Sequence, residues 1–106
     1  IQNALNHARQ HLHRPLSVEE LAEAVHLSPR QFTRIFTAET GQSPAKAVER
    51  LRLEAARVMV EQSRHSLDVI AKETGFRNRR HMREVFIRGF GVPPQAIRRD
   101  VRSIVT

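Results

Sequence analysis

Residues 44–62 read PAKAVERLRLEAARVMVEQ, and this stretch decides how the rest of the chain is organised. Nothing after its first residue breaks a helix, so we expect one long helix. Placing side chains at about 100° per residue gives two apolar strips, whereas an ordinary surface helix has one. The strips are Ala47, Val48, Leu51, Ala55, Val58 and Met59, and then Leu53, Ala56 and Val60. Two strips predict a helix held between two small lobes, each seated on one strip.

Composition narrows the class of protein. At 106 residues the chain has the size of one domain, or of two small lobes that share one helix. The absence of cysteine excludes disulfides, thiolate metal sites and a cysteine nucleophile, and it fits a reducing cytoplasm. No membrane-length apolar run and no signal-peptide pattern are found. We therefore expect a cytoplasmic protein with no membrane partner and, since it begins at Ile1, a fragment of something longer.

The net charge of +7 is unevenly distributed along the chain. Residues 1–73 hold ten basic and nine acidic side chains, whereas residues 74–102 hold eight arginines and two acids. Arginine suits bidentate contacts with phosphate and guanine, so the second segment predicts a nucleic-acid partner. Five phenylalanines without Trp or Tyr argue against stacking surfaces for single strands.

The residues before the long helix predict three helices. The first spans residues 1–13 and ends at an Arg-Pro step. The second begins after Ser17, which forms a capping box with Glu20. The third begins at Ser28-Pro29 and ends at Gly41. Its inner face would bury Phe32, Ile35 and Phe36, and its outer face would carry Arg30, Gln31, Thr33, Arg34 and Thr37.

The sequence repeats after the long helix. The segment SLDVIA from Ser66 matches SVEELA from Ser17 at an offset of 49. The second copy then contains one extra residue, so the offset becomes 50. At this offset three pairs match: Phe36 with Phe86, Gly41 with Gly91, and Pro44 with Pro94. The second copy would be capped by Asn78, bury Met82, Val85 and Phe86, and expose Arg79, Arg80, His81 and Arg83. A short closing helix is expected over residues 94–101.

Both copies place an alanine four residues before the turn between their helices: Ala22 before His26, and Ala71 before Gly75. A small side chain lets two helices approach closely. The turn residue is expected to need a positive φ, which glycine adopts freely and histidine only occasionally.

Two helices joined by a three- or four-residue turn, with an arginine-bearing second helix, are typical of a helix-turn-helix. The sequence thus predicts an all-α fold of about seven helices. Residues 1–43 and 63–106 would form the two lobes and residues 44–62 the linker helix. The 18 residues from Ala45 to Gln62 span about 27 Å as a helix, and successive major-groove faces lie roughly 34 Å apart. The linker could therefore set two recognition helices into adjacent major-groove segments of double-stranded DNA.

The chain resembles the DNA-binding domain of AraC/XylS-type transcription regulators over essentially its whole length. The matching segments are LSVEELAEAVHLSPRQFTRIFTAETGQSPAKAVERLRLEAARVMV and IAKETGFRNRRHMREVFIRGFGVPPQAIRR. The resemblance implies a seven-helix fold and regulation of transcription. It extends to members with an N-terminal amidotransferase-like (DJ-1/PfpI) domain, so we expect a sensor or dimerisation domain, as well as RNA polymerase, as partners.

Carried over by position, the resemblance implies that bases are read by Arg30, Thr33, Arg34, Arg79, Arg80 and Arg83. Secondary or phosphate contacts would come from Gln31, Thr37, Asn78, His81, Arg88 and Arg98. The chain departs from the family at Glu84, where many relatives carry arginine. A carboxylate there either accepts from a cytosine amino group or pairs with Arg80 or Arg88, and we expect the pair.

No catalytic residue, metal or cofactor is predicted. His7 and His11 lie one turn apart but lack an evident third ligand. Ser66 beside His65 and Asp68 reads as a helix cap rather than a catalytic triad. The chain is therefore expected not to be an enzyme. Two alternatives remain open at this stage: a DNA-targeting module of a larger enzyme, and a helical protein-interaction domain.

Overall fold

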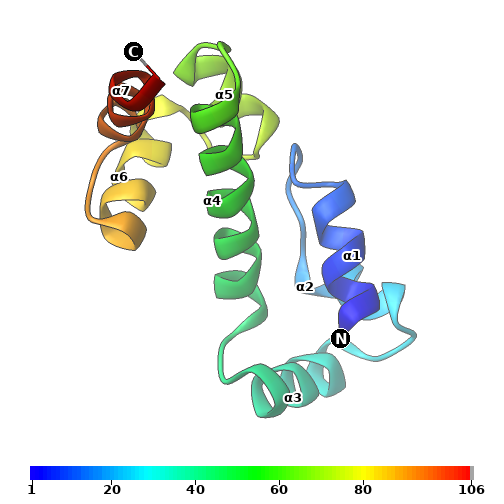
Figure 1. Cartoon of the computed structure of the whole chain (residues 1–106). Helices are drawn as coiled ribbons and strands as arrows, with labels where there is room; N and C mark the ends of the chain where they lie inside the picture. Colours follow the sequence, from blue (N-terminus) through cyan, green and yellow to red (C-terminus); the bar gives the residue numbers. More distant parts are fainter. Residues whose placement is uncertain (106) are drawn as a thin grey trace. The chain divides into compact units, whose positions relative to one another are not determined.

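The computed structural model describes the backbone of residues 1–105 and the side chains of residues 1–101. Over this range the chain forms seven α-helices and no strand, which confirms the predicted all-α class (Figure 1). The helices are α1 (Gln2–Gln10), α2 (Val18–Ala24), α3 (Pro29–Thr40), α4 (Pro44–Gln62), α5 (Leu67–Glu73), α6 (Arg79–Phe90) and α7 (Pro94–Val105). Within the described residues, none of these helices combines the length and the apolar character that crossing a membrane requires.

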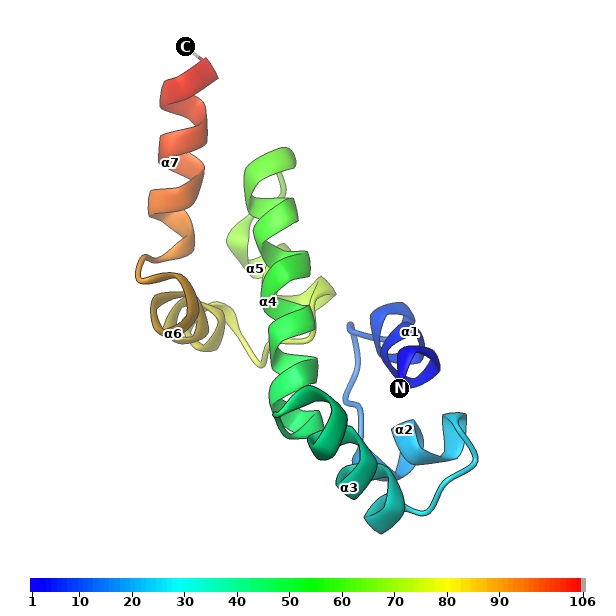
Figure 2. The same cartoon turned by 60° about the horizontal axis from the view of Figure 1, so that its bottom comes forward.

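Two helix ends differ from the prediction. Helix α1 ends at Gln10 rather than at residue 13, because the chain turns at His11, whose N–H bonds to the carbonyl of Ala8. Helix α7 continues to Val105 instead of ending at Val101, and Figure 2 shows it as an uninterrupted helix. No proline or glycine stands between these last two positions to end it.

The predicted N-caps at Ser17 and Ser28 are confirmed, but the complete capping box lies at Ser28 and not, as expected, at Ser17. The hydroxyl of Ser17 accepts from the Glu20 N–H at 3.1 Å, but the Glu20 carboxylate is bonded elsewhere, so the expected capping box is only half formed. The complete capping box lies at Ser28, whose hydroxyl accepts from the Gln31 N–H while the Gln31 side chain bonds back to the Ser28 backbone. Ser43 caps the long helix α4.

The chain divides into two compact units. The first is Ile1–Leu51, in which α1 packs on α2 and α2 packs on α3. Two phenylalanines on α3, Phe32 and Phe36, are at most 2% exposed and anchor its core. The other buried apolar residues of this unit are Ala4, Ala8, Leu12, Leu21, Ala22, Ala47 and Val48.

The second unit begins at Arg52 and contains the rest of α4 together with α5, α6 and α7. Its apolar core comprises Leu53, Ala56, Val60, Leu67, Ile70, Ala71, Phe76, Met82, Val85, Phe86 and Ile97. Helix α6 comes especially close to α4 at Gly89, where an added Cβ would lie 2.5 Å from Cδ2 of Leu53. The repeat in the sequence has therefore produced two separately packed cores.

The long helix contributes to both cores, though not as its two strips predict. Ala47 and Val48 are buried in the first unit, and the strip of Leu53, Ala56 and Val60 is buried in the second. Two members of the wider strip depart from the expectation: Met59 packs against the core of the second unit, and Val58 is 50% exposed. The division between the units runs across the helix, between Leu51 and Arg52, and not only along its faces.

Candidate nucleic-acid interface

The two helix pairs α2–α3 and α5–α6 turn in the same way. In each pair the first helix ends in a Schellman motif, in which a residue past the helix end bonds back to a buried alanine. Leu27 N donates to the Ala22 carbonyl at 3.0 Å, and Phe76 N donates to the Ala71 carbonyl at 2.9 Å. The residue at the corner has a positive φ in both cases, as expected: 59° at His26 and 82° at Gly75.

Helix α3 presents one polar face to solvent. Its apolar anchors Phe32 and Phe36 point into the core, so the residues on the other side are exposed. Positions 30, 33, 34 and 37 share one face at helical spacing. The predicted contact residues of this unit are all exposed: Arg30, Gln31, Thr33, Arg34 and Thr37. The structure therefore exposes the whole predicted set of the first unit, with Arg30, Thr33, Arg34 and Thr37 on one face.

One of these residues already has a structural role. The side-chain oxygen of Gln31 accepts from the backbone N–H of Ser28 at 3.3 Å and from its hydroxyl at 3.1 Å. The amide oxygen thus belongs to the cap of α3, which leaves the NH₂ group as the part of Gln31 that a DNA contact would use.

Helix α6 presents the corresponding face of the second unit. Met82, Val85 and Phe86 are at most 1% exposed and fix the orientation of the helix. The exposed side chains are Arg79, Arg80, Arg83, Glu84, Ile87 and Arg88. Asn78 caps the helix, its Oδ1 accepting from the His81 N–H at 2.8 Å. All three predicted base-reading arginines of α6 therefore lie on the outside of a firmly anchored helix.

Glu84, the position at which this chain differs from many family members, forms an ion pair with Arg80. The Arg80 Nε lies 3.6 Å from the Glu84 Oε1, one helical turn away, and both side chains are largely exposed. This confirms the expected pairing of Glu84 with Arg80. The pair is open to solvent and therefore weak, so it leaves the Arg80 guanidinium able to exchange partners.

Ile87 was missed by sequence reasoning, which assigned only polar residues to the outer face. It is 39% exposed on α6, on the side that also carries Arg80 and Arg83. The internal repeat could have identified it. Ile87 lies 50 residues after Thr37 and so occupies the same place in the second copy as Thr37, which is predicted to contact DNA, does in the first.

Arg98, predicted as a secondary or phosphate contact, holds the second unit together. Its guanidinium donates to three backbone carbonyls, those of Val60 at 3.2 Å, Ser63 at 3.2 Å and His65 at 2.8 Å. These carbonyls lie at the end of α4 and in the connection to α5, where helix geometry supplies no donor. Arg98 therefore has a structural role, and its contact with phosphate stays a prediction.

Arg52 has a similar structural role nearer to the turn. Its Nη1 donates to the carbonyl of Thr74, the C-cap residue of α5, at 3.3 Å. Burial lowers the pKa of the Arg52 guanidinium from its usual value. Together with the buried hydroxyl of Thr74, which donates to the Ile70 carbonyl at 2.7 Å, this contact fixes the end of α5 directly before the turn.

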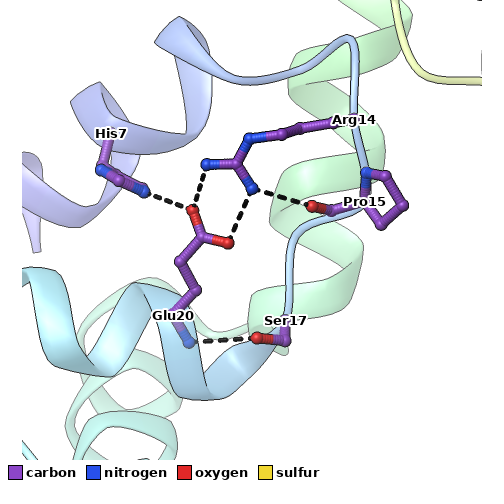
Figure 3. A network of polar contacts seen from close by, with 5 residues as sticks. All are labelled: His7, Arg14, Pro15, Ser17 and Glu20. Carbon is purple, nitrogen blue, oxygen red and sulfur yellow. Dashed lines mark hydrogen bonds and ion pairs between the residues drawn. The ribbon is translucent and has the colours of Figure 1, made fainter.

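A polar network in the first unit centres on the Glu20 carboxylate (Figure 3). The Glu20 carboxylate accepts two bonds from the Arg14 guanidinium, at 2.8 and 2.7 Å, and lies 2.6 Å from the His7 Nε2. The bonds from Arg14 and then His7 lower the pKa of Glu20 to about 2. The network connects α1, the following loop and α2, and it explains why Glu20 does not complete the capping box at Ser17.

Two further clusters named from the sequence can be placed in the structure. Among the described residues, no group of three or more histidines, aspartates or glutamates could hold a metal ion. Ser66, beside His65 and Asp68, accepts from the Val69 N–H at 3.2 Å and so acts as the N-cap of α5, as expected.

Comparison with known proteins agrees with this geometry. Residues 21–100 match a protein family described as a helix-turn-helix domain. The HTH-type transcriptional regulator Rv1931c of Mycobacterium tuberculosis is 42% identical over 82 residues, which cover 77% of this chain and 32% of that protein. The transcriptional activator RclR of Escherichia coli is 31% identical over 88 residues, covering 83% and 31%. The chain therefore spans about a third of the length of these relatives.

Two solved structures are similar over nearly the whole fold. The DNA-binding domain of AdpA, solved in complex with a target DNA, has a TM-score of 0.88 at 33% identity and covers 96% of this chain and 92% of that one. A transcriptional regulator with an AraC-type DNA-binding domain from Chromobacterium violaceum has a TM-score of 0.89 at 28% identity, with coverage of 94% and 89%.

Proposed function

Because this chain belongs to the AraC/XylS-type family of helix-turn-helix regulators, we propose that it binds specific sequences in double-stranded DNA and thereby regulates transcription. Helices α3 and α6 would be its recognition helices, each entering a major-groove segment. The observation that carries this proposal is the repeated anchoring of the two helices. Each buries its main apolar anchors, Phe32 and Phe36 on α3 and Met82, Val85 and Phe86 on α6, and exposes a face that bears arginines. The AdpA domain, which has the same fold and a bound target DNA, supports it.

The two recognition faces suggest different kinds of contact. On α3, Arg30, Thr33 and Arg34 would read bases, and Thr37 would support them. On α6 the readers would be Arg79, Arg80 and Arg83, with Arg88 contacting phosphate. Arginine bonds bidentately to guanine O6 and N7 in the major groove. The exposed Ile87 adds a further contact of a different class, because an apolar side chain on a recognition face suits the methyl group of thymine.

The rest of the proposal concerns the intact protein. Since the chain spans about a third of its curated relatives, we assign sensing or dimerisation to a further N-terminal domain, in line with the resemblance to regulators with an amidotransferase-like domain. RNA polymerase would be the partner through which the bound protein acts on transcription. The chain, residues 1–106, would contribute DNA binding to the intact protein and no catalytic step. Its place of action would be the bacterial cytoplasm, where the chromosomal DNA lies.

The decisive experiment is selection of bound sequences from a random duplex pool. Two short sequence boxes about one helical turn apart are expected, one for each recognition helix. Affinity for the selected duplex should fall roughly 10³- to 10⁵-fold between 50 and 200 mM salt if six to ten phosphates are contacted. Recovery of unrelated sequences with no common box would count against base reading.

The role of the long helix can be tested with the same duplex. Inserting two residues between Leu51 and Arg52 should turn one unit by about 200° relative to the other. Specific binding should then be lost, although each unit keeps its own core. A variant that binds the selected duplex as well as the parent protein would contradict the use of two fixed recognition helices.

A further inference from the structure

His81 is held by three contacts at the start of the second recognition helix. Its Nδ1 accepts from the backbone N–H of Arg77 at 3.2 Å. Its own backbone N–H donates to Oδ1 of Asn78 at 2.8 Å. Its ring lies edge-on to Phe76, with centroids 5.5 Å apart and an interplanar angle of 74°. The imidazole therefore connects the turn before α6 to the first turn of the helix.

The first unit shows what this connection replaces. Gln31 occupies the same position in α3, and its side-chain oxygen accepts from the backbone N–H of Ser28. In the second unit the turn is longer by one residue, Arg77, which has no counterpart in the first. The His81 imidazole accepts from the N–H of this inserted residue and so fastens the longer turn to α6.

This bond exists only for one form of the imidazole. An Nδ1 that accepts a hydrogen bond carries no proton, so the ring is neutral and its proton is on Nε2. Protonating Nδ1 would break the bond, because the N–H of the ring would then point at the backbone N–H of Arg77 and neither group can accept. It would also add a positive charge to the N-terminal end of a helix, where cations are disfavoured.

Charged groups lie on the turn itself and on the elements around it. On the turn and on α6 they are Arg77, Arg79, Arg80, Arg83 and Glu84, of which Glu84 pairs with Arg80. On α5 they are Lys72 and Glu73, which follow each other at its end. From α4 comes Arg52, whose guanidinium donates to the Thr74 carbonyl just before the turn. Apart from Glu73 and Glu84, all of these groups are basic.

We propose that His81 is a positioning residue for the second recognition helix, and that it holds α6 in its DNA-binding geometry only while the imidazole is neutral. This inference rests on the proposed function and deepens it. Because histidine ordinarily titrates near pH 6.5, binding should weaken as the pH falls through that region. A histidine that contacts phosphate directly would behave in the opposite way, because its imidazolium form binds phosphate more strongly.

The test compares the dissociation constant for the selected duplex at pH 7.5 and 5.5, at constant ionic strength, in the parent protein and in two variants. His81→Asn keeps an acceptor at the δ position but cannot titrate, and it serves as the reference for the pH dependence. His81→Phe keeps a ring against Phe76 but has no acceptor, and it should bind more weakly at pH 7.5. Relative to His81→Asn, the parent should lose about 3- to 10-fold in affinity at pH 5.5, the range that one hydrogen bond accounts for.

Comparison with His81→Asn removes the contribution of the other histidines, because they are present in both proteins. If the parent instead gained affinity relative to His81→Asn at pH 5.5, the proposal would be overturned in favour of a direct phosphate contact by His81. Equal binding by His81→Phe and the parent at pH 7.5 would overturn it as well.

A measurement without DNA separates this inference from the proposed function. The ¹⁵N shifts of the His81 ring in the free protein at pH 7.5 should show a proton on Nε2 and none on Nδ1. The opposite tautomer would overturn the cap whether or not DNA binds. If the tautomer is as expected but no duplex is bound at any pH, the proposed function fails, and the DNA-binding role of His81 fails with it.

Discussion

The two helix-turn-helix units have the same backbone geometry at their turns but different side chains on their exposed faces. Both close the end of their first helix with a bond back to the carbonyl of a buried alanine, pass through a positive-φ corner and anchor the second helix with a buried phenylalanine. Their outer faces are different. Helix α3 carries two arginines and one glutamate, whereas α6 carries four arginines and one glutamate. The fold is therefore set by a few inward positions, and the outward positions are left to determine what each unit binds.

The largest effect is expected from breaking one core and leaving the other. Replacing Phe86 by alanine removes a fully buried ring and should cost the second unit about 3–5 kcal/mol of its free energy of unfolding. Because the two cores are packed separately, amides in α3 should keep their hydrogen-exchange protection in this variant. Phe36→Ala is the matched control, with protection retained in α6 instead. Simultaneous loss of protection in both units would show that the cores do not act separately.

Next in size is the difference between the two recognition faces. Arg83 and Thr33 occupy the same position in the repeat, so alanine at each tests what the arginine adds. Arg83→Ala should weaken binding to the selected duplex by about 1–3 kcal/mol and relax base preference at one position. Thr33→Ala should have the smaller effect. Quantitative selection with both variants measures this, and a uniform loss across all sequences would reassign Arg83 to phosphate.

The corners of the two turns allow a reciprocal exchange. A residue with a side chain in the left-handed region is strained by about 1–2 kcal/mol relative to glycine. His26→Gly should therefore stabilise the first unit by about 1 kcal/mol, and Gly75→His should destabilise the second by a similar amount. Urea denaturation followed by residue-resolved amide signals would measure both. Equal and opposite shifts would show that the corners are equivalent, and destabilisation by His26→Gly would show that the His26 side chain contributes more than its strain costs.

The smallest effect is expected at Glu20, because its network is partly exposed and therefore screened by solvent. The pKa of Glu20 is about 2 in the folded protein against an ordinary value of 4.5. Since folding lowers this pKa, the carboxylate stabilises the first unit above pH 4.5, and the contribution is lost as the pH falls towards 2.

The variant Glu20→Gln should thus melt at a slightly lower temperature than the parent protein at pH 7, and the difference should disappear near pH 2. The second unit supplies a control, because the corresponding position is Val69, which is 42% exposed and cannot titrate. A difference in melting temperature that persists unchanged at pH 2 would contradict the assignment to the ionised carboxylate.

Much of the fold was predictable because it depends on local chemistry. Caps such as Ser28 and Asn78 act within four residues, and the positive φ at His26 followed from its alignment with Gly75. The inward and outward positions of α3 and α6 followed from helical spacing. Each of these features is written in a short window of sequence.

What could not be predicted depends on residues far apart in the chain. Arg98 meets carbonyls 33 to 38 positions away, and periodicity says nothing about such a contact. Glu20 fits a local capping box, yet Arg14 and His7 provide stronger, charge-assisted partners once α1 packs on α2. Val58 and Met59 belong to one strip by angle, yet Met59 packs against the core of the second unit while Val58 is 50% exposed.

The main-chain bonds that the two turns share have a consequence for how such proteins diversify. The bonds that close each turn join main-chain atoms, and the anchors of α3 and α6 face inward, so substitutions at positions such as Arg34 or Arg83 leave folding almost unaffected. Mutations there are close to neutral for stability and can accumulate under selection for a new operator alone. A gene duplicate can thus acquire a new set of target promoters through substitutions on two helix faces, while the inherited scaffold remains intact.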